Sequence, residues 1–341
     1  MPFDREQIKV KVAELAARGV FIGTSSWKYE GWLDQLYTPA RYEKKAKSRA
    51  LAEQTSFANL QVETPVAKPV KVDKKTFEKD CLTEYAEVFK SVSVDATYYK
   101  FPDETLLRGW ADAVPVDFRF AFKLTKDITI KRFPNRPEEG DRAGTVNTNF
   151  LNARLLADAF LQPCDSIRSK VGVLMLEFSH FWPSEYRRIG EFIEELDRFL
   201  SELPKGWPYA IELRNKDWLT PEYFACLARH RVVHVYNAWE AMPTVTEQMA
   251  LPGSMTNPSL LAARFLLKPG RKYQDAKDTY HPYKLTHEVN HEARKAIGQL
   301  IKLALAATGG NLVKALIFIN NRLEGNALNT IAAVLESGEW R

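Results

Sequence analysis

The sequence predicts an α/β fold, a single TIM-type (β/α)8 barrel with an extra N-terminal helix and long loops at the strand ends. Short runs of β-branched and aromatic residues alternate with longer helical patterns along the chain, which is typical of βα units around a parallel sheet. There are eight such runs, the number of strands that closes this barrel. Near-continuous apolar runs such as GVLML and KALIFI suit strands that are buried on both faces.

The expected elements follow in chain order. The strands are residues 20–24, 92–95, 118–123, 172–177, 209–212, 232–236, 261–267 and 315–320. The helices are residues 76–90, 104–113, 150–162, 184–202, 221–230, 284–306 and 326–337, and the extra N-terminal helix is at about 5–18. Ser184 and Thr220 are the expected N-caps of their helices, because short hydroxyl side chains accept hydrogen bonds from free helical N–H groups.

A single domain over residues 1–341 is the expected organisation, with a basic loop insertion at about 41–79. A barrel of this class commonly reaches this length as one domain. Neither a composition shift nor a Gly/Ser linker separates two halves, and there is no internal repeat. A doubly wound open sheet is the alternative, but neither GxGxxG nor GxxxxGK[ST] follows the first strand.

The net charge of +5 comes from one segment. Residues 41–79 hold ten Lys and Arg against five Asp and Glu. We interpret this segment as a solvated insertion, and the alternative is that it attracts an anionic partner such as nucleic acid. We expect neither a signal peptide nor a membrane span, and therefore a cytoplasmic protein. The three cysteines are expected to be buried, reduced thiols.

Polar residues stand at the end of every predicted strand. The C-terminal strand ends of a barrel converge on the face where active sites are built, so these side chains predict a site there. The candidate catalytic residues are Asp95, Lys123, Glu177 and Glu212. The candidate substrate-binding residues are Thr24, Ser25, Trp27, Tyr29, Arg214, Asn237, Arg264, Asn320 and Asn321.

The charged candidates are three carboxylates and three cations. Two of the carboxylates are suited to general acid–base catalysis, because burial and mutual repulsion separate their pKa values. Alternatively, Lys123, Arg214 and Arg264 neutralise the carboxylates in structural ion pairs, or they bind a phosphate or carboxylate. If the carboxylates occupy the cations, a neutral polar ligand is favoured.

Aromatic residues are frequent in the same loops. Flat rings beside hydrogen-bonding groups suit sugars or unstacked bases, and the alternative is that they pack the loops onto the barrel. No metal site is predicted and the cofactor is left open. Among the histidines, only His287 and His291 have i, i+4 spacing within one predicted helix, and we assign them to a solvated helix face. The aromatic loop residues are Trp27, Tyr29, Trp32, Tyr37, Tyr98, Tyr99, Trp182, Trp218 and Trp239.

Seven segments in this order resemble the YecE-like family, also known as domain of unknown function 72. They are GTSSWKYEGW, VSVDATYYKFP, FRFAFKLTKDIT, KVGVLMLEFSHF, IELRNKDWL, ARFLLKPGRKY and IFINNRLEGNA. The resemblance spans about residues 20–337 and implies a TIM barrel with a polar pocket at the strand ends. The chain departs from the commoner family pattern in that Ser93 and Asp95 replace Glu and Asn, and Glu177 replaces Gln.

Three functions are consistent with these patterns. The leading hypothesis is a metal-independent enzyme that acts on a small polar or anionic ligand, such as a sugar, sugar phosphate or nucleotide. The second is a nucleic-acid-associated protein, similar to endonuclease IV, that uses the basic segment 41–79. The third is a barrel that binds a ligand without catalysis.

Overall fold

The eight predicted strands close into one parallel barrel. A computed structural model describes residues 3–43, 72–306, 314–338 and 340. The strands pair in chain order, and β1 also pairs with β8, which closes the ring. The bounds are β1 (Val20–Ser25), β2 (Ser91–Val94), β3 (Arg119–Lys123), β4 (Val171–Phe178), β5 (Tyr209–Leu213), β6 (Val233–Ala238), β7 (Leu260–Phe265) and β8 (Lys314–Ile319). The predicted TIM-type fold is therefore confirmed.

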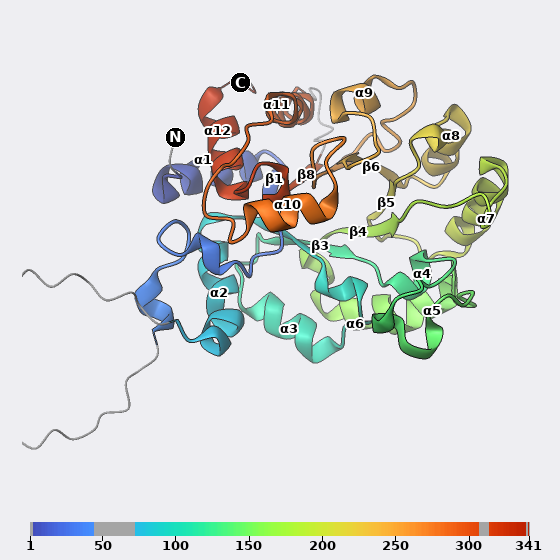
Figure 1. Cartoon of the computed structure of the whole chain (residues 1–341), viewed down its shortest axis with the longest axis horizontal. Coiled ribbons are helices and arrows are strands. Elements are labelled where there is room, and N and C mark those ends of the chain that lie inside the picture. The colour runs from blue at the N-terminus through green and yellow to red at the C-terminus, as the bar shows by residue number, and fades with distance from the viewer. Residues whose placement is uncertain (1–2, 44–71, 307–313, 339, 341) are drawn as a thin grey trace, which may run out of the picture.

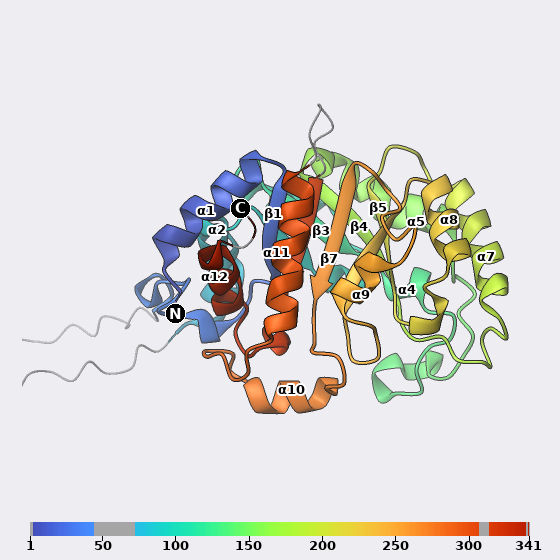
Figure 2. The same ribbon diagram turned by 90° about the horizontal axis from the view of Figure 1, so that it is seen from above.

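Helices surround the barrel, and one short helix crosses its opening (Figure 1). They are α1 (Arg5–Ala17), α2 (Lys74–Val88), α3 (Glu104–Asp112), α4 (Lys126–Thr129), α5 (Ala153–Leu156), α6 (Gln162–Cys164), α7 (Ile189–Glu202), α8 (Pro221–Arg229), α9 (Val245–Ala250), α10 (Tyr273–Tyr280), α11 (His291–Leu305) and α12 (Ala327–Ser337). Figure 2 shows α10 beyond the end of β7, where the chain leaves the barrel. No helix in the described part of the chain is long and apolar enough to cross a bilayer.

Two helix predictions need correction. The helix expected at 184–202 begins only at Ile189, because the residues after Trp182 form a turn instead, so Ser184 is not its N-cap. The helix expected at 284–306 begins at His291, because Asn290 caps it and Glu324 holds the preceding segment in a loop. His287 and His291 therefore do not share a helix face.

Other expectations are confirmed or lie outside the described residues. Thr220 caps α8 by accepting a hydrogen bond from the backbone of Tyr223. The three cysteines are free and buried. Residues 44–71, which form most of the basic segment 41–79, lie outside the described residues, so the solvated insertion and the nucleic-acid alternative both stay predictions. Three short helices, α4, α9 and α10, lie where no helix was predicted.

Alternate residues of each strand face the barrel interior, as the two-residue repeat of a strand requires. The interior apolar cluster is Phe21, Ala121, Val173, Met175, Ala210, Val233, Val235, Ala262, Leu316 and Phe318, with Leu260 and Ala16 packed against it. The same alternation, continued to the C-terminal strand ends, places polar side chains inward. These are Ser25, Asp95, Lys123, Glu177, Glu212, Asn237, Arg264 and Asn320. The apolar floor of the barrel therefore lies beneath a polar mouth.

Gly23 permits the close approach of β1 to β2. A Cβ atom built on Gly23 would lie 2.1 Å from the backbone oxygen of Ser91, which cannot move without breaking the barrel. We expect Gly23→Ala to lower the free energy of unfolding by about 3 kcal/mol, because overpacking forces the backbone to shift.

Gly109→Ala is the control, because Gly109 lies in α3 and no atom lies within 4 Å of the added methyl group. Helix propensity predicts that it stabilises the protein by about 0.5–1 kcal/mol. Urea unfolding measures the free energy of unfolding of both variants. Equal values for Gly23→Ala and Gly109→Ala would contradict the prediction.

Because of His234, we expect the free energy of unfolding to decrease on mild acidification. It lies on β6 among the rings of Tyr223, Phe224 and Tyr236, and burial lowers its pKa from 6.5 to about 3. The folded protein therefore holds His234 neutral while the unfolded chain binds a proton below pH 6.5. Stability is fully present above that pH and falls as the pH decreases towards 3, by about 2 kcal/mol between pH 7 and 5.

Chemical denaturation of wild type and His234→Phe at pH 7, 6 and 5 checks the pH effect. The variant keeps an aromatic ring in this aromatic pocket and removes the titrating group, so its stability should fall less over this range. An identical pH slope in the two proteins would show that another group causes the loss.

Candidate functional site

Arg264 on β7 lies at the centre of a charged cluster at the strand ends. Its Nη1 donates hydrogen bonds to Glu177 Oε2 at 2.8 Å and to Glu212 Oε2 at 2.5 Å. Its Nη2 donates to Asp95 Oδ1 at 3.1 Å. One guanidinium therefore connects carboxylates that three other segments of the barrel, at β2, β4 and β5, bring to the mouth.

Two more cations complete this cluster. Arg214 Nη2 lies 2.9 Å from Glu177 Oε2 and 2.9 Å from Glu212 Oε1. Lys123 Nζ lies 2.8 Å from Glu177 Oε2. A single carboxylate oxygen of Glu177 thus meets all three cations. We call the set the mouth cluster, and it consists of Asp95, Lys123, Glu177, Glu212, Arg214 and Arg264.

The mouth cluster is neutral and largely buried. Removal of a charge from water costs several kcal/mol per ion, so the arrangement is stable only because each charge meets opposite charges. Glu177, Glu212 and Arg264 are almost fully buried, whereas 34% of the Asp95 side chain is exposed. Asp95 is therefore the carboxylate of the cluster that a molecule in the mouth reaches first.

Burial and charge act against each other on the pKa values of this cluster. Burial lowers the pKa of Lys123, although Glu177 and Asp95 oppose this effect. Burial alone would raise the pKa of Glu177, but the cations Arg214, Lys123 and Arg264 lower it well below its usual range. Glu177 is therefore a fixed anion at neutral pH, and Lys123 releases its proton more readily than an ordinary lysine.

Aromatic rings cover two of the cations. Lys123 Nζ lies 3.7 Å from the centre of the Tyr98 ring, and the Arg214 guanidinium lies 3.8 Å from that of Trp239. Such cation–π contacts stabilise a partly desolvated cation by about 0.5–2 kcal/mol. Tyr99, whose ring packs edge-on against Tyr98, is exposed beside them. The rim of the mouth therefore presents flat ring surfaces next to charges.

Several buried polar atoms near the mouth cluster have no hydrogen-bond partner among the described residues. An unsatisfied buried polar group costs about 1–3 kcal/mol, so these atoms need an explanation. A polar molecule held in the mouth would satisfy such groups. The atoms are Ser25 Oγ, Ser93 Oγ, Asn237 Oδ1, Arg264 Nε and Asn320 Nδ2.

Thr24 and Asn321 are engaged in packing contacts away from the mouth cluster. Thr24 alternates with the inward residues, and its hydroxyl lies 3.0 Å from the Tyr85 hydroxyl on α2. Asn321 Oδ1 accepts hydrogen bonds from Trp32 Nε1 at 3.3 Å and from the backbone of Ala327 at 2.8 Å. These contacts hold α2, the loop after β1 and α12 on the barrel, so this placement adds no support to the expected binding roles.

Trp27 and Tyr29 pack the loop that follows β1. Trp27 is buried with its ring edge-on to Trp110 at 5.8 Å. The Tyr29 hydroxyl donates to the Ser25 backbone oxygen at 3.1 Å, and its ring lies 4.7 Å from that of Trp32. The aromatic residues of this loop therefore pack it onto the barrel, which was the alternative to ligand binding. Trp239 and Tyr98, in contrast, lie against the charged cluster.

A protein-family model matches most of the chain. Residues 69–340 match the family described as Protein of unknown function DUF72. The chain belongs to the DUF72 family. This confirms the resemblance found in the sequence motifs, although the matched range starts after the first of them.

Solved structures of DUF72 family proteins share the fold. A protein from Enterococcus faecalis V583 (EF0366) is 19% identical with a TM-score of 0.56, covering 93% of this chain and 95% of that chain. One from Thermotoga maritima MSB8 (TM1631) is 16% identical with a TM-score of 0.53, covering 93% and 98%. Such low identity establishes the barrel and no activity. A search of curated proteins found no match.

Arg322 of this DUF72 chain is not among the site residues predicted from the sequence. Its guanidinium lies 4.6 Å from the centre of the Tyr273 ring. Loss of hydration raises the pKa of the Tyr29 hydroxyl and, although its ring is largely exposed, that of the Tyr99 hydroxyl; the positive charge of Arg322 partly offsets this in both. Arg322 therefore lies near the rim. Its place directly after the predicted strand-end residues Asn320 and Asn321 is the signal that could have identified it.

One group of potential metal ligands is found among the described residues, on the outside of the barrel. Asp197 of α7 meets Cys226 of α8 and His230 directly after it. Asp197 Oδ1 already has hydrogen bonds with His230 Nε2 and with Arg229, both at 2.8 Å. This group is separate from the mouth cluster, and the expectation that the protein binds no metal stays a prediction.

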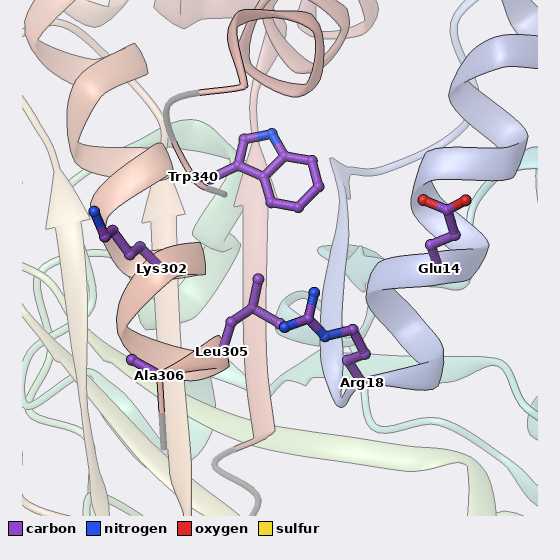
Figure 3. A pocket seen from close by; sticks show the side chains of 6 residues that line it. All are labelled: Glu14, Arg18, Lys302, Leu305, Ala306 and Trp340. Carbon is purple, nitrogen blue, oxygen red and sulfur yellow. The ribbon is translucent and has the colours of Figure 1, made fainter. Parts of the chain in front are cut away.

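A cavity of about 490 Å³ lies away from the mouth, between α1 and the end of α11 (Figure 3). Arg18 on its wall lies two residues before the start of β1, which places the cavity at the N-terminal side of the strands. It is lined by Glu14, Arg18, Lys302, Leu305, Ala306 and Trp340. In such barrels this side supports stability rather than catalysis.

Proposed function

We propose that this protein is an enzyme that acts on a small polar substrate by general acid–base catalysis at the barrel mouth. The observation that carries the proposal is the mouth cluster, a buried and charge-balanced set of six side chains at the C-terminal strand ends. Apolar side chains of similar volume would fill this position at no greater cost in stability. Its placement on the catalytic face of the barrel supports a chemical role.

Asp95 and Lys123 are the proposed proton-transfer groups. Asp95 Oδ1 is bound by Arg264, while its Oδ2 has no hydrogen bond to any residue that the structure describes. The free oxygen is therefore available as a general base. Lys123, whose pKa burial lowers, is the proposed acid, because a lowered pKa makes its proton easier to donate.

The other four charged groups are proposed to position these two. Arg264 holds Asp95, and Glu177 holds Lys123. Arg214 and Glu212 connect both sides of this set. Because every carboxylate of the cluster already meets a cation, catalysis by protein groups without a bound metal is the mechanism that the arrangement favours.

The substrate class is proposed from the rim. Flat rings beside hydrogen-bonding groups suit the faces of sugars and of nucleobases. Tyr98 and Trp239 supply such rings, and the unpartnered atoms of Ser25 and Asn320 supply polar contacts. Sugars, sugar phosphates and nucleotides are therefore the compounds to test.

Asp95→Asn tests the catalytic assignment. A panel of sugars, sugar phosphates and nucleotides is first screened with wild type for thermal stabilisation and for conversion, detected by mass spectrometry. With the compound found, we expect Asp95→Asn to lower kcat by about 10²–10⁴-fold, the usual contribution of a general base, with a smaller change in KM.

Asp117→Asn is the matched control, since Asp117 pairs with Lys90 at the opposite end of β3 and should leave kcat unchanged. Full turnover by Asp95→Asn would contradict its role. A compound that binds tightly to wild type without conversion would favour the non-catalytic ligand-binding barrel instead.

A further inference from the structure

We propose a phosphate-binding subsite at the rim of the mouth, where β7 and β8 end, with Arg322 as its central ligand. The inference rests on the proposed function and makes it more specific, because the substrate would then carry a phosphate group. The subsite consists of Arg322 with the loop that joins β7 to α10, residues 266–272.

Arg322 is a cation without a counter-ion among the residues that the structure describes. Its Nε is buried and has no hydrogen-bond partner there, and its guanidinium lies against the Tyr273 ring. All three cations of the mouth cluster, in contrast, are matched by carboxylates. The guanidinium of Arg322 is charged, lies near a neutral cluster and has N–H groups without acceptors in the described part of the chain. Such a group suits bidentate binding to two oxygens of a phosphate or carboxylate.

The loop after β7 adds positive charge beside Arg322. Lys268 and Arg271 share one carboxylate, that of Glu288, so one of these two charges is not balanced. The surrounding segment is also basic. Residues 268–278 together with Glu288 and Arg322 hold five Lys and Arg against three Asp and Glu. Gly270 has a φ of +82°, which lets this loop turn sharply between its two cations.

The subsite is continuous with the proposed catalytic centre. α10 packs against the short helix that carries Arg322. The ring centre of Tyr273, the first residue of α10, lies 6.3 Å from that of Trp239. Trp239 covers Arg214 of the mouth cluster. A molecule whose ring rests on Trp239 can therefore place one end towards Arg322 and the other towards Asp95.

Phosphate is favoured over a neutral polar group or a single carboxylate. A dianionic phosphate suits two unbalanced cations, and its oxygens match the planar donors of a guanidinium. The loops after strands seven and eight, together with a short additional helix, are also the part of this barrel architecture that binds phosphate in many enzymes. The segment with α10 has this layout.

Inorganic phosphate is the probe for the test. We measure its binding to wild type by isothermal titration calorimetry and ³¹P line broadening, in chloride buffers of matched ionic strength. We expect saturable binding that Arg322→Met weakens at least tenfold. Arg229→Met removes an exposed cation from the end of α8 and should leave phosphate binding unchanged. The circular dichroism spectrum and thermal midpoint of each variant report on folding.

The outcomes separate this inference from the proposed function. Phosphate binding that Arg322→Met and Arg229→Met reduce equally, or no binding at all, overturns the subsite. If Asp95-dependent turnover of an unphosphorylated compound is then found, the enzyme proposal stands without it. Conversely, Arg322-dependent phosphate binding with no turnover of any compound supports the subsite and contradicts the enzyme proposal.

Discussion

Arg264→Met is expected to lower the free energy of unfolding by about 3–5 kcal/mol, the cost of leaving buried charges without a partner. Arg264 binds Glu177, Glu212 and Asp95 through its two Nη atoms. Without it, three carboxylates at the mouth face only two cations. Glu212 is fully buried, so water cannot replace the lost guanidinium.

Arg108→Met provides a surface control for the same chemical change. Arg108 pairs with Glu104 on the outer face of α3, and 63% of its side chain is exposed. Exposed helical ion pairs contribute only about 0.3–0.5 kcal/mol. Guanidinium chloride would change the ion pairs by screening, so urea unfolding followed by circular dichroism is the measurement. A loss of less than about 1 kcal/mol in Arg264→Met would contradict the prediction.

A double variant separates charge imbalance from lost packing. Glu212→Gln in the Arg264→Met background restores the balance of the cluster to two carboxylates and two cations. We expect it to recover part of the stability, with a coupling energy of about 1–3 kcal/mol. If the double variant is less stable than the single one by the full effect of Glu212→Gln, packing rather than charge explains the loss.

The barrel could be predicted because its strands carry a strong local signal. Strands such as β4 and β8 are buried on both faces and therefore read as continuous apolar runs. The convergence of strand ends then follows from the architecture, so six charged residues at the ends of five strands could be assigned to one mouth. α10 was missed because its segment YQDAKDTY is largely polar and has little apolar periodicity.

The pairing of the charges could not be predicted from sequence. Whether Lys123, Arg214 and Arg264 bind carboxylates or a ligand depends on distances of a few tenths of an ångström between different strands. The structure shows that all three bind carboxylates, which is the structural ion-pair alternative, whereas Arg322 is a cation near the rim without a counter-ion among the described residues. A distinct catalytic role therefore depends on the partly exposed members of the cluster and on the titration of Lys123.

Lys123→Met is expected to abolish turnover or ligand affinity while the protein stays folded. Met replaces the Lys stem with a side chain of similar length, so contacts with Tyr98 are largely kept. Glu177 retains both Arg214 and Arg264 as counter-ions, which limits the expected loss of stability to about 1–2 kcal/mol. If Lys123 donates the proton, kcat/KM falls by about 10²–10⁴-fold.

The pH dependence of the wild type gives an independent readout of the same group. Burial lowers the pKa of Lys123, so the alkaline limb of the kcat/KM profile should lie below the pH at which an ordinary lysine titrates. Activity falls there as pH rises, because the acid loses its proton. The limb should be absent from the residual activity of Lys123→Met, whereas a merely structural lysine would leave the limb in place.

Lys126→Met is the matched control, because Lys126 has the same side-chain exposure of 11% and one buried carboxylate partner, Glu139, outside the mouth cluster. Both variants remove a buried lysine that pairs with a glutamate, yet only one removes the proposed acid. We therefore expect similar losses of stability and a difference of at least 10²-fold in kcat/KM. Equal activities would leave Lys123 as a structural ion pair, and unfolding of Lys123→Met would assign the cluster to stability rather than to chemistry.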